Sequence, residues 1–581
     1  MIKDNSKSHL GIVTIFIIPL IITILAIQLK KATGPYWLGV NSDPSYIYLM
    51  NSLYLVNGIT PIFVDHPGIT LQMLGALVVK ALHWNIANNT IPDRVFSDPE
   101  YYLNAIHFVL LFSYIASLIA VGLYAFKRTK NIVFSLFVQT ASFLFLTVIP
   151  MMVNVNAEAV LITVLNLYIL CVLKLYFDFE GEAHNRSMVL FGMVCALGVA
   201  TKITFLPLLI GPFILYRGLR AKLVFGFSFL ISWFILTIPI IPRYGKMFHW
   251  WSGLIVYTGT HGSGERGFIN IGRYTGSLWN LIRVDSFLFA IVVCCLMIVL
   301  WGIKSQHKRD GSVAKLKKIL RFLSVFSLIV VAQFLMAAKQ GYVHYTTPAV
   351  GLVGLLACLL LEYVNTKFKV SDRFSMTLLS IFIVIFCFSA VRYADQLSKR
   401  NNEIYRFSKM IYEKYKGCII CGYYRSSSPL TAMDFGDDCY GFKAYGQALQ
   451  SKFPDACFYN RWNHLFHRFS DYVYPQDLLK NNPCVLLYGD SAVFPEYLQL
   501  KEIESSPHEK LYKILSTTAE EAVKYYLVTK SLEAKHQYSE AYRVALKAKS
   551  AGFPMMDEYI AQLRSLIEKN GASSSQYVPV K

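Results

Sequence analysis

The sequence predicts an α-helical polytopic membrane protein with about eleven transmembrane helices, followed by a smaller soluble α/β domain. Of the 581 residues, 55% are hydrophobic and only 16% are charged, whereas soluble domains contain about 25% charged residues. Apolar stretches of membrane-spanning length follow one another through the first two thirds of the chain, and the last third is polar. The predicted domains are residues 1–394 in the membrane and residues 395–581 outside it.

The apolar stretches approach the length of about 20 residues that a helix needs to cross a bilayer. The predicted spans are 11–29, 103–126, 132–150, 157–177, 187–201, 203–216, 223–241, 284–303, 320–338, 345–361 and 374–391. The first is interpreted as a retained helix, because no small-residue cleavage site of a signal peptide follows it. The short pair 187–201 and 203–216 predicts two half-length helices or a hairpin that turns at Thr201-Lys202. Residues 66–86 predict an amphipathic helix that lies at the membrane interface.

The basic residues predict the orientation of these helices. The formal net charge is +20, and much of it lies in short loops that all fall on one side if the N-terminus is cytoplasmic. We interpret this charge as topology and not as affinity for nucleic acid. Eleven crossings then place the C-terminal domain outside. The prediction is a multi-pass protein of the bacterial inner (plasma) membrane with a periplasmic or extracellular C-terminal domain.

The polar tail predicts a small α/β domain. Strand-like runs at 418–424, 456–460 and 484–490 alternate with helical patterns. From about residue 518 to 568 the pattern indicates one or two helical hairpins. Cys418 and Cys421 have the spacing of a metal or redox pair, but their apolar surroundings favour a buried strand. The tail has five cysteines in all, an odd number that fits no simple disulfide framework.

Carboxylates of the membrane part gather on the face away from the basic loops. Asp43, Asp65 and Glu158 lie at the mouths of outer loops. A carboxylate at such a place can act as a general base or bind a cation. The same positions suit helix caps, or a favourable interaction with a helix dipole, so both interpretations stay open.

Cations and histidines share that face. They are His66, Lys202, Arg243, His261, Arg266 and His344. A lysine in apolar surroundings, such as Lys202, is costly unless it pairs with a phosphate or a carboxylate, or snorkels to water. The glycine-rich loop 261–274 can fold over a ligand or be a plain surface loop. The short outer turn 339–348, which includes Tyr345, is expected to border the same cavity.

Several activities lack their sequence signatures. The chain contains no P-loop, GxSxG elbow or HExxH sequence. These absences argue against a nucleotide-driven pump, a serine hydrolase and a common zinc protease.

The pattern of these residues resembles the GT-C superfamily of membrane glycosyltransferases, nearest to the protein-mannosyltransferase-like (family 39) branch. The resemblance covers roughly residues 10–395. It rests on an acidic residue early in the first outer loop, a glutamate patch at the fourth span, an ATK hairpin followed by LP, and a short HY..P turn. It implies a GT-C-like fold. It also implies transfer of a hexose or pentose from a polyprenyl-phosphate donor to a lipid, glycan or protein acceptor at the outer face.

The resemblance also implies roles for particular residues. Asp43 matches the first-loop catalytic carboxylate, but Ser42 stands where many relatives carry a second acid, so Asp65 or Glu158 is the alternative. The implied binding residues for the donor phosphate are Lys202, Arg243, Arg266, His344 and His66, and those of a substrate loop are His261, Glu265 and Tyr345. No cofactor is implied with certainty, and a divalent metal ion stays open. Membrane lipids are expected partners, and nucleic acid is not.

Two other functions remain as alternatives. A lipid or glycolipid transporter or flippase requires charges near the bilayer midplane and related helix repeats, whereas the polar residues here cluster at loop mouths. A scaffold whose tail binds a partner leaves the carboxylates and cations of the membrane part unexplained.

Overall fold

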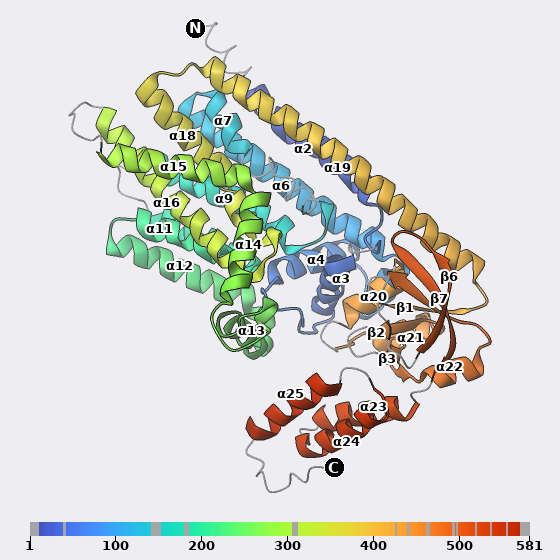
Figure 1. The fold of residues 1–581 in the computed structure, drawn as a ribbon. Coiled ribbons are helices and arrows are strands. Elements are labelled where there is room, and N and C mark those ends of the chain that lie inside the picture. Colours follow the sequence, from blue (N-terminus) through green and yellow to red (C-terminus); the bar gives the residue numbers. More distant parts are fainter. Residues whose placement is uncertain are drawn as a thin grey trace. The chain divides into compact units, whose positions relative to one another are not determined.

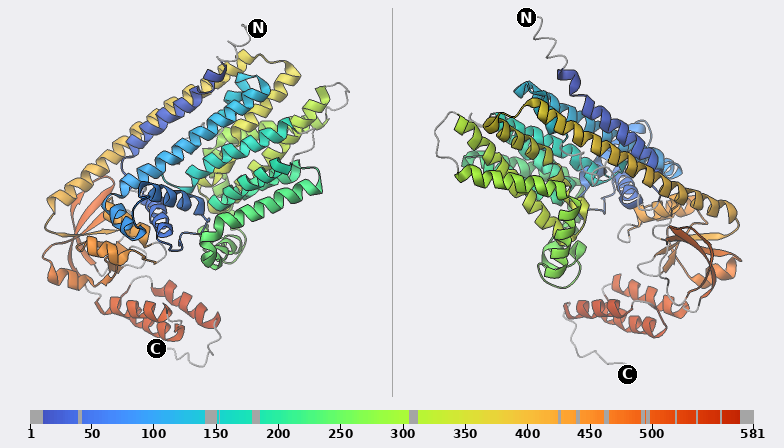
Figure 2. Two further views of the ribbon diagram at one scale, coloured as in Figure 1. Left: turned by 180° about the vertical axis from the view of Figure 1, so that it is seen from behind. Right: turned by 45° about the horizontal axis from the view of Figure 1, so that its top comes forward.

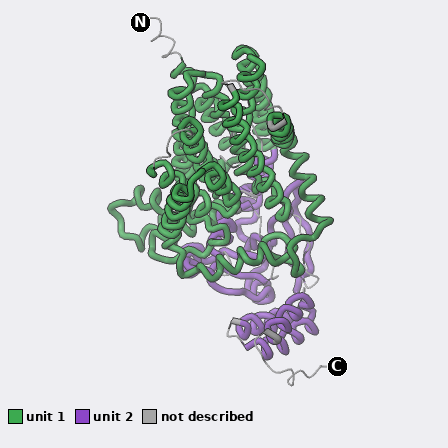
Figure 3. Tube along the Cα trace, turned by 90° about the vertical axis from the view of Figure 1, so that its left-hand side faces the viewer, with its two compact units in different colours: residues 1–36, 44–399 green, residues 37–43, 400–581 purple. Residues whose placement is uncertain are grey.

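The computed structural model describes residues 11–38, 42–140, 151, 153–178, 185–304, 312–423, 427–438, 442–460, 465–490, 494, 498–517, 520–534, 537–553 and 556–569. The chain forms two compact units (Figure 3). Unit 1 comprises Met1–Tyr36 and Pro44–Lys399, and unit 2 comprises Trp37–Asp43 and Arg400–Lys581. The domain boundary predicted at residues 394/395 stays a prediction, and helix α19 (Asp372–Lys414) runs through it without a break.

The described residues of unit 1 form helices joined by turns and loops (Figures 1 and 2). Its α-helices before α19 are α2 (Ile17–Thr33), α3 (Ser42–Val56), α4 (Ile69–Leu82), α5 (Ile91–Ser97), α6 (Pro99–Thr129), α7 (Ile132–Gln139), α9 (Ala157–Phe177), α10 (Asn185–Thr201), α11 (Ile210–Leu215), α12 (Leu219–Thr237), α13 (Tyr244–Val256), α14 (Ile271–Val284), α15 (Ser286–Lys304), α16 (Ser312–Gln340), α17 (Thr347–Val350) and α18 (Val353–Phe368). Short 3-10 helices are η2 (Asn88–Thr90), η3 (Ile203–Leu209), η4 (Ile238–Arg243), η5 (Thr260–Gly262) and η6 (Val343–Thr346).

Fewer helices than predicted are long enough to cross a membrane. Seven helices of the described chain have the necessary length and apolarity: Gly11–Thr33, Pro99–Thr129, Ala157–Phe177, Leu219–Val256, Val313–Gln340, Val343–Phe368 and Asp372–Lys414. An eighth is formed if α14 and α15, which meet at a 92° bend, count as one span. The polytopic helical class is therefore confirmed, and the number of about eleven spans is not.

The difference in number has a local cause at three of the predicted spans. Residues 187–201 and 203–216 form the short helices α10, η3 and α11, as the half-length alternative predicts. The predicted span 132–150 contains α7 as far as Gln139, and residues 141–150 lie outside the described part of the chain. The apolar helix expected within 66–86 is α4, which has 14 residues.

Two of the long helices start at capping residues that can be recognised in the local sequence. Asp98 caps α6 by accepting a hydrogen bond from the Tyr101 backbone N–H at 3.1 Å, with Pro99 in the first turn. Asn156 caps α9 by accepting from the Ala159 N–H at 3.0 Å. This cap starts α9 so that Glu158 lies in its first turn.

Unit 2 contains a seven-stranded sheet in the order β4-β3-β2-β1-β5-β7-β6. The strands are β1 (Ile419–Tyr423), β2 (Cys457–Asn460), β3 (Leu465–His467), β4 (Tyr472–Val473), β5 (Val485–Asp490), β6 (Leu498–Ser505) and β7 (Glu509–Thr517). The central strand β1 is parallel to both β2 and β5. The helices of the unit after α19 are α20 (Pro429–Asp437), α21 (Gly446–Lys452), α22 (Pro475–Asn481), α23 (Glu520–Ala534), α24 (Tyr538–Ser550) and α25 (Met556–Lys569). The predicted α/β class and the helical C-terminal segment are confirmed.

Four tail cysteines form two disulfides, Cys418–Cys484 and Cys421–Cys457. The buried-strand interpretation of Cys421 is confirmed, since it lies in β1 and is fully buried. The expectation that no disulfide framework fits the tail is wrong. Cys421 and Cys457 are directly opposite each other in the β1–β2 pair. The number of cysteines alone cannot predict this strand register. The fifth cysteine, Cys439, lies outside the described residues.

Candidate active site

Two distant turns of the chain pair through their backbones and build the centre of the site. The Gly68 N–H donates to the Thr201 carbonyl at 3.1 Å, and the Ile203 N–H donates to the His66 carbonyl at 3.1 Å. Gly68 has a left-handed φ of 66°, a conformation that glycine adopts without steric cost. The pairing forms a backbone bridge between Pro67 and Lys202 directly after the end of α10, so that His66 and Lys202 come close together in space.

Lys202 and Glu158 form a buried ion pair in which the lysine Nζ donates to Glu158 Oε1. The two residues are only 6% and 5% exposed. His344 Nε2 lies 4.0 Å from the same carboxylate oxygen. The Lys202 ammonium also lies 4.8 Å from the centre of the Tyr345 ring, within the range of a cation–π interaction. The lysine is therefore held in place from two sides.

His66 is neutral at physiological pH. Burial, followed by the nearby positive charge of Lys202, lowers its pKa to about 3. Its Nε2 makes a 2.7 Å hydrogen bond with the Tyr48 hydroxyl, and its ring packs edge-on against Phe63. Burial and Lys202 also lower the pKa of His261. The imidazoles near Lys202 thus add polar groups without adding positive charge.

A cavity of about 620 Å³ opens beside this cluster. Its lining includes the polar side chains of His66, Lys202, Thr204, Lys339, Gln340 and Tyr345. The rest of its wall is mostly apolar or aromatic: Ile203, Leu206, Trp250, Trp251, Leu254, Ile255, Phe268, Ile269, Tyr274, Leu335, Met336 and Ala337. The cavity therefore suits a ligand that combines an anionic group with an apolar body.

The loop that follows α13 is held over the end of α16. The His261 backbone N–H donates to Gln340 Oε1 at 2.8 Å. The Lys339 ammonium donates to the Ile255 carbonyl at 3.1 Å and lies 4.6 Å from the centre of the Phe268 ring. Residues of this loop thereby form one wall of the cavity.

The structure brings some predicted site residues together and leaves others apart. His66, Glu158, Lys202, His344 and Tyr345 form one connected group. Within this group, His66, Lys202 and Tyr345 line the cavity, whereas Glu158 and His344 do not. Four further predicted residues are also absent from its lining: Arg243 at the end of η4, and His261, Glu265 and Arg266, which are exposed in the segment after α13.

The two remaining predicted carboxylates, Asp65 and Asp43, are not among the residues that line the cavity. Asp65 is buried, and its backbone carbonyl accepts a 2.9 Å hydrogen bond from Trp251 Nε1. Burial raises the pKa of Asp65 to about 6, and Lys246 opposes the shift. The cap interpretation places Asp43 just before a helix, whereas α3 already begins at Ser42 and Asp43 lies in its first turn. The side chain of Asp43 is outside the described part of the structure.

Sequence reasoning missed several residues of the cavity and of the polar group beside it. Tyr48 gave no signal, because its contact with His66 depends on tertiary structure. Gln340 was not singled out. Trp250 and Trp251 were not singled out either, and both line the cavity.

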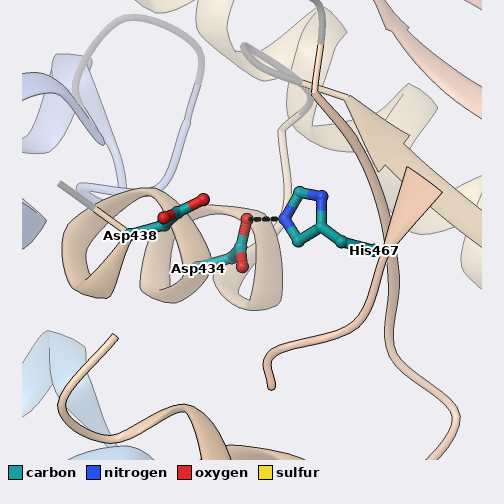
Figure 4. A group of neighbouring side chains, drawn as sticks. All are labelled: Asp434, Asp438 and His467. Atoms are coloured by element: carbon teal, nitrogen blue, oxygen red, sulfur yellow. Dashed lines mark hydrogen bonds and ion pairs between the residues drawn. The ribbon is translucent and has the colours of Figure 1, made fainter. Parts of the chain in front are cut away.

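Among the described residues of unit 2, Asp434, Asp438 and His467 form a group of metal-ligand residue types (Figure 4). Their nearest ligand atoms lie within 4.8 Å of one another. His467 Nε2 is 2.9 Å from Asp434 Oδ2. Lys443 Nζ lies 3.7 Å from Asp434 Oδ1 and 3.6 Å from Asp438 Oδ2. The ammonium already supplies the countercharge that a metal ion would bring, so we interpret the group as an ion-pair cluster.

Comparison with known proteins finds little similarity at the level of sequence. No family model matches the chain, and no curated protein matches it. Among solved structures, the chain is similar to ArnT from Cupriavidus metallidurans, which was crystallised bound to undecaprenyl phosphate. The identity is 10%, the TM-score is 0.43, and the match covers 85% of this chain and 97% of the ArnT chain.

Proposed function

We propose that this protein is a membrane glycosyltransferase that moves a sugar from a polyprenyl-phosphate donor to a lipid, glycan or protein acceptor. The observation that carries the proposal is the polarity of the large cavity. A buried cation, Lys202, lines this cavity, and most of the other lining side chains are apolar or aromatic. A polyprenyl phosphate has the matching polarity, with an anion at the head of a long apolar chain.

Lys202 suits the stabilisation of a departing phosphate. An ammonium group has three N–H donors, and Glu158 takes one of them. The others remain for phosphate oxygens that gain negative charge as the bond to the sugar breaks. A cation already held in position in a site with little water stabilises such charge without reorganising, and this effect is often the largest in catalysis.

Glu158 is best suited to positioning Lys202. Its carboxylate is engaged by the ammonium, so it is a poor candidate for taking a proton from the acceptor. Glu158 thereby holds the cation where the donor phosphate would bind. His344 and Tyr345, from the turn after α16, border the same ion pair.

The proposed base is Asp43, on the evidence of its place in the sequence, with Asp65 as the alternative. The acceptor hydroxyl gives its proton to this carboxylate. Its oxygen bonds to the anomeric carbon from the face opposite the phosphate. The bond between that carbon and the phosphate oxygen breaks, and both electrons leave with the polyprenyl phosphate. The configuration of the sugar inverts.

The proposal is tested by sugar transfer in purified protein. Protein in lipid nanodiscs is supplied with a panel of polyprenyl-phosphate sugars carrying radiolabel, together with a broad acceptor extract. We expect transfer by the wild type and a loss of at least about 100-fold in Lys202→Met, corresponding to about 3 kcal/mol of transition-state stabilisation. Asp43→Asn is expected to abolish transfer. Lys399→Gln, which removes a cation whose side chain is 76% exposed, serves as the matched control.

Three results would change the assignment. Transfer that survives in Asp43→Asn but fails in Asp65→Asn moves the base to Asp65. Transfer that is unchanged in a folded Lys202→Met variant removes the basis of the proposal. Movement of a fluorescent polyprenyl phosphate between leaflets, with no turnover of any donor, favours a transporter or flippase.

A further inference from the structure

A second cavity of about 400 Å³ lies within unit 1 at the ends of four membrane-length helices. Its lining includes Thr129 at the end of α6, Lys315 near the start of α16, Glu362 and Asn365 near the end of α18, and Asp372 and Ser375 near the start of α19. Where transmembrane helices begin and end together, the surrounding lipid is the headgroup layer. The position of the cavity therefore points to a lipid headgroup as its ligand.

This cavity is separate from the candidate active site. Helix α16 borders both, with Lys315 in the second cavity and Leu335 in the first. Twenty residues of α-helix separate these two positions, a rise of about 30 Å, which equals the thickness of the hydrocarbon core. The two cavities thus lie at opposite ends of the span, and the inference does not depend on the proposed glycosyl transfer.

Two polar atoms in the wall of the second cavity have no hydrogen-bond partner among the described residues. They are the side-chain oxygen of Asn365 and the hydroxyl oxygen of Ser375. Ser375 is completely buried. A buried polar group without a partner is costly, so a ligand that completes these hydrogen bonds would stabilise the site.

The chemistry of the wall selects a donor-rich cation with an anion beside it. Asn365 offers a free carbonyl oxygen. Glu362 is a carboxylate that already accepts from the Tyr176 hydroxyl at 2.8 Å and lies 3.2 Å from Lys315 Nζ. Lys315 is about half exposed, at 53% of its side chain, so it can turn from Glu362 towards an anion at the opening.

We propose that the second cavity binds the headgroup of phosphatidylethanolamine. The primary ammonium donates N–H groups to Asn365, Ser375 and Glu362, and the adjacent phosphate lies against Lys315. Phosphatidylcholine carries the same charge, but its quaternary nitrogen has no N–H and leaves Asn365 unsatisfied. Phosphatidylglycerol has no cation to place between Asn365 and Glu362.

The test compares lipid binding by the full-length protein. Purified protein is titrated with phosphatidylethanolamine, its N-methylated forms and phosphatidylcholine, and bound lipid is counted by native mass spectrometry. We expect phosphatidylethanolamine to bind at least about tenfold more tightly than phosphatidylcholine, with binding falling as methyl groups replace N–H groups. The double variant N365L/S375A is expected to lose this difference. Thr377→Val, whose hydroxyl already bonds the Arg373 carbonyl at 3.0 Å, is expected to keep it.

Each contrary result is decisive. Equal binding of the two lipids by the wild type, or no retained lipid, overturns the proposal. A preference that persists in N365L/S375A, shown to be folded by its melting temperature, overturns the assignment to this cavity. Full competition by soluble phosphoethanolamine at equal concentration overturns the lipid as the ligand and assigns a soluble amine.

Discussion

At the scale of single residues, the buried pair of Lys202 and Glu158 is the central feature. Taking both charges out of water is costly, and the pair is stable only because each charge compensates the other. A buried pair of this kind is weak evidence for stability. It is better explained as a device that keeps a cation at a fixed place, which is what the proposed phosphate site requires.

The coupling of this pair can be measured. We expect Lys202→Met and Glu158→Gln each to lower the free energy of unfolding, and Lys202→Met by about 3–5 kcal/mol because it leaves a carboxylate unpaired. The double variant is expected to lose less than the sum of the single variants. Chemical denaturation of the three variants in detergent measures the three losses of unfolding free energy. Additive losses would show that the two side chains act independently.

His66 is expected to make the stability of the protein depend on pH. The folded pKa of about 3 lies below the value of about 6.5 for an unfolded histidine. Above pH 6.5 the imidazole is neutral in both states and contributes nothing. Below it the unfolded state binds a proton that the folded state does not, so stability falls by up to about 1.4 kcal/mol for each pH unit.

Between pH 7 and pH 5 we therefore expect the wild type to lose about 2 kcal/mol more than His66→Asn. Asp65, with its raised pKa of about 6, acts in the opposite direction, because its folded state holds a proton that the unfolded state has released. It is present in both proteins and cancels in the difference. Parallel curves of stability against pH for the two proteins would refute the assignment of a neutral His66.

At the scale of elements, the end and the packing of the short helix α10 depend on contacts with neighbouring segments. It ends at Thr201, where the backbone turns to pair with residues 66–68. It also packs closely against α12, since a Cβ atom at Gly192 would lie 2.7 Å from the Phe225 carbonyl oxygen and 2.9 Å from the Phe229 nitrogen. The close approach of two backbones requires glycine at this position.

Gly192→Ala is accordingly expected to separate α10 from α12 and to lower stability by about 1–3 kcal/mol. Gly226→Ala, in the adjoining α12, is the control, because nothing lies within 4 Å of the added methyl group. That control is expected to be neutral or slightly stabilising. Melting temperatures in one detergent compare the two. An equal effect of both substitutions would mean that helix propensity, and not packing, is being measured.

At the scale of the whole molecule, the cysteines divide according to the two units. Four cysteines of unit 2 form disulfides, whereas those of unit 1 are free. Disulfides persist in oxidising compartments and are rare in the cytosol. The pairing therefore supports the predicted placement of the C-terminal domain on the outer side of the membrane.

Alkylation of the denatured protein tests this placement. If only the two disulfides form, seven of the eleven cysteines are free to react before reduction and all eleven after it, since two disulfides protect four. Replacing the pair Cys421 and Cys457 by serine is expected to destabilise unit 2 by about 2–5 kcal/mol. Eleven reactive thiols in protein from cells with active disulfide formation would contradict an outer location.

The sequence by itself determined the class of protein and the residue types at the site. Long apolar stretches can be stable only in a membrane, and the cap at Asn156 begins its helix from local chemistry alone. The polar residues at the mouths of the loops could also be recognised from the sequence, because a charged residue such as Lys202 is unusual in apolar surroundings.

Only the tertiary structure decided how these parts combine. The pairing of Lys202 with Glu158, the contact of Tyr48 with His66, and the disulfide between Cys421 and Cys457 join positions that are 44, 18 and 36 residues apart. Arg243, Glu265 and Arg266 had the same residue types and predicted side as the others, yet they do not line the cavity. Residue type and sidedness are local properties, whereas contact depends on helix packing and strand register, which the chain acquires only when it folds.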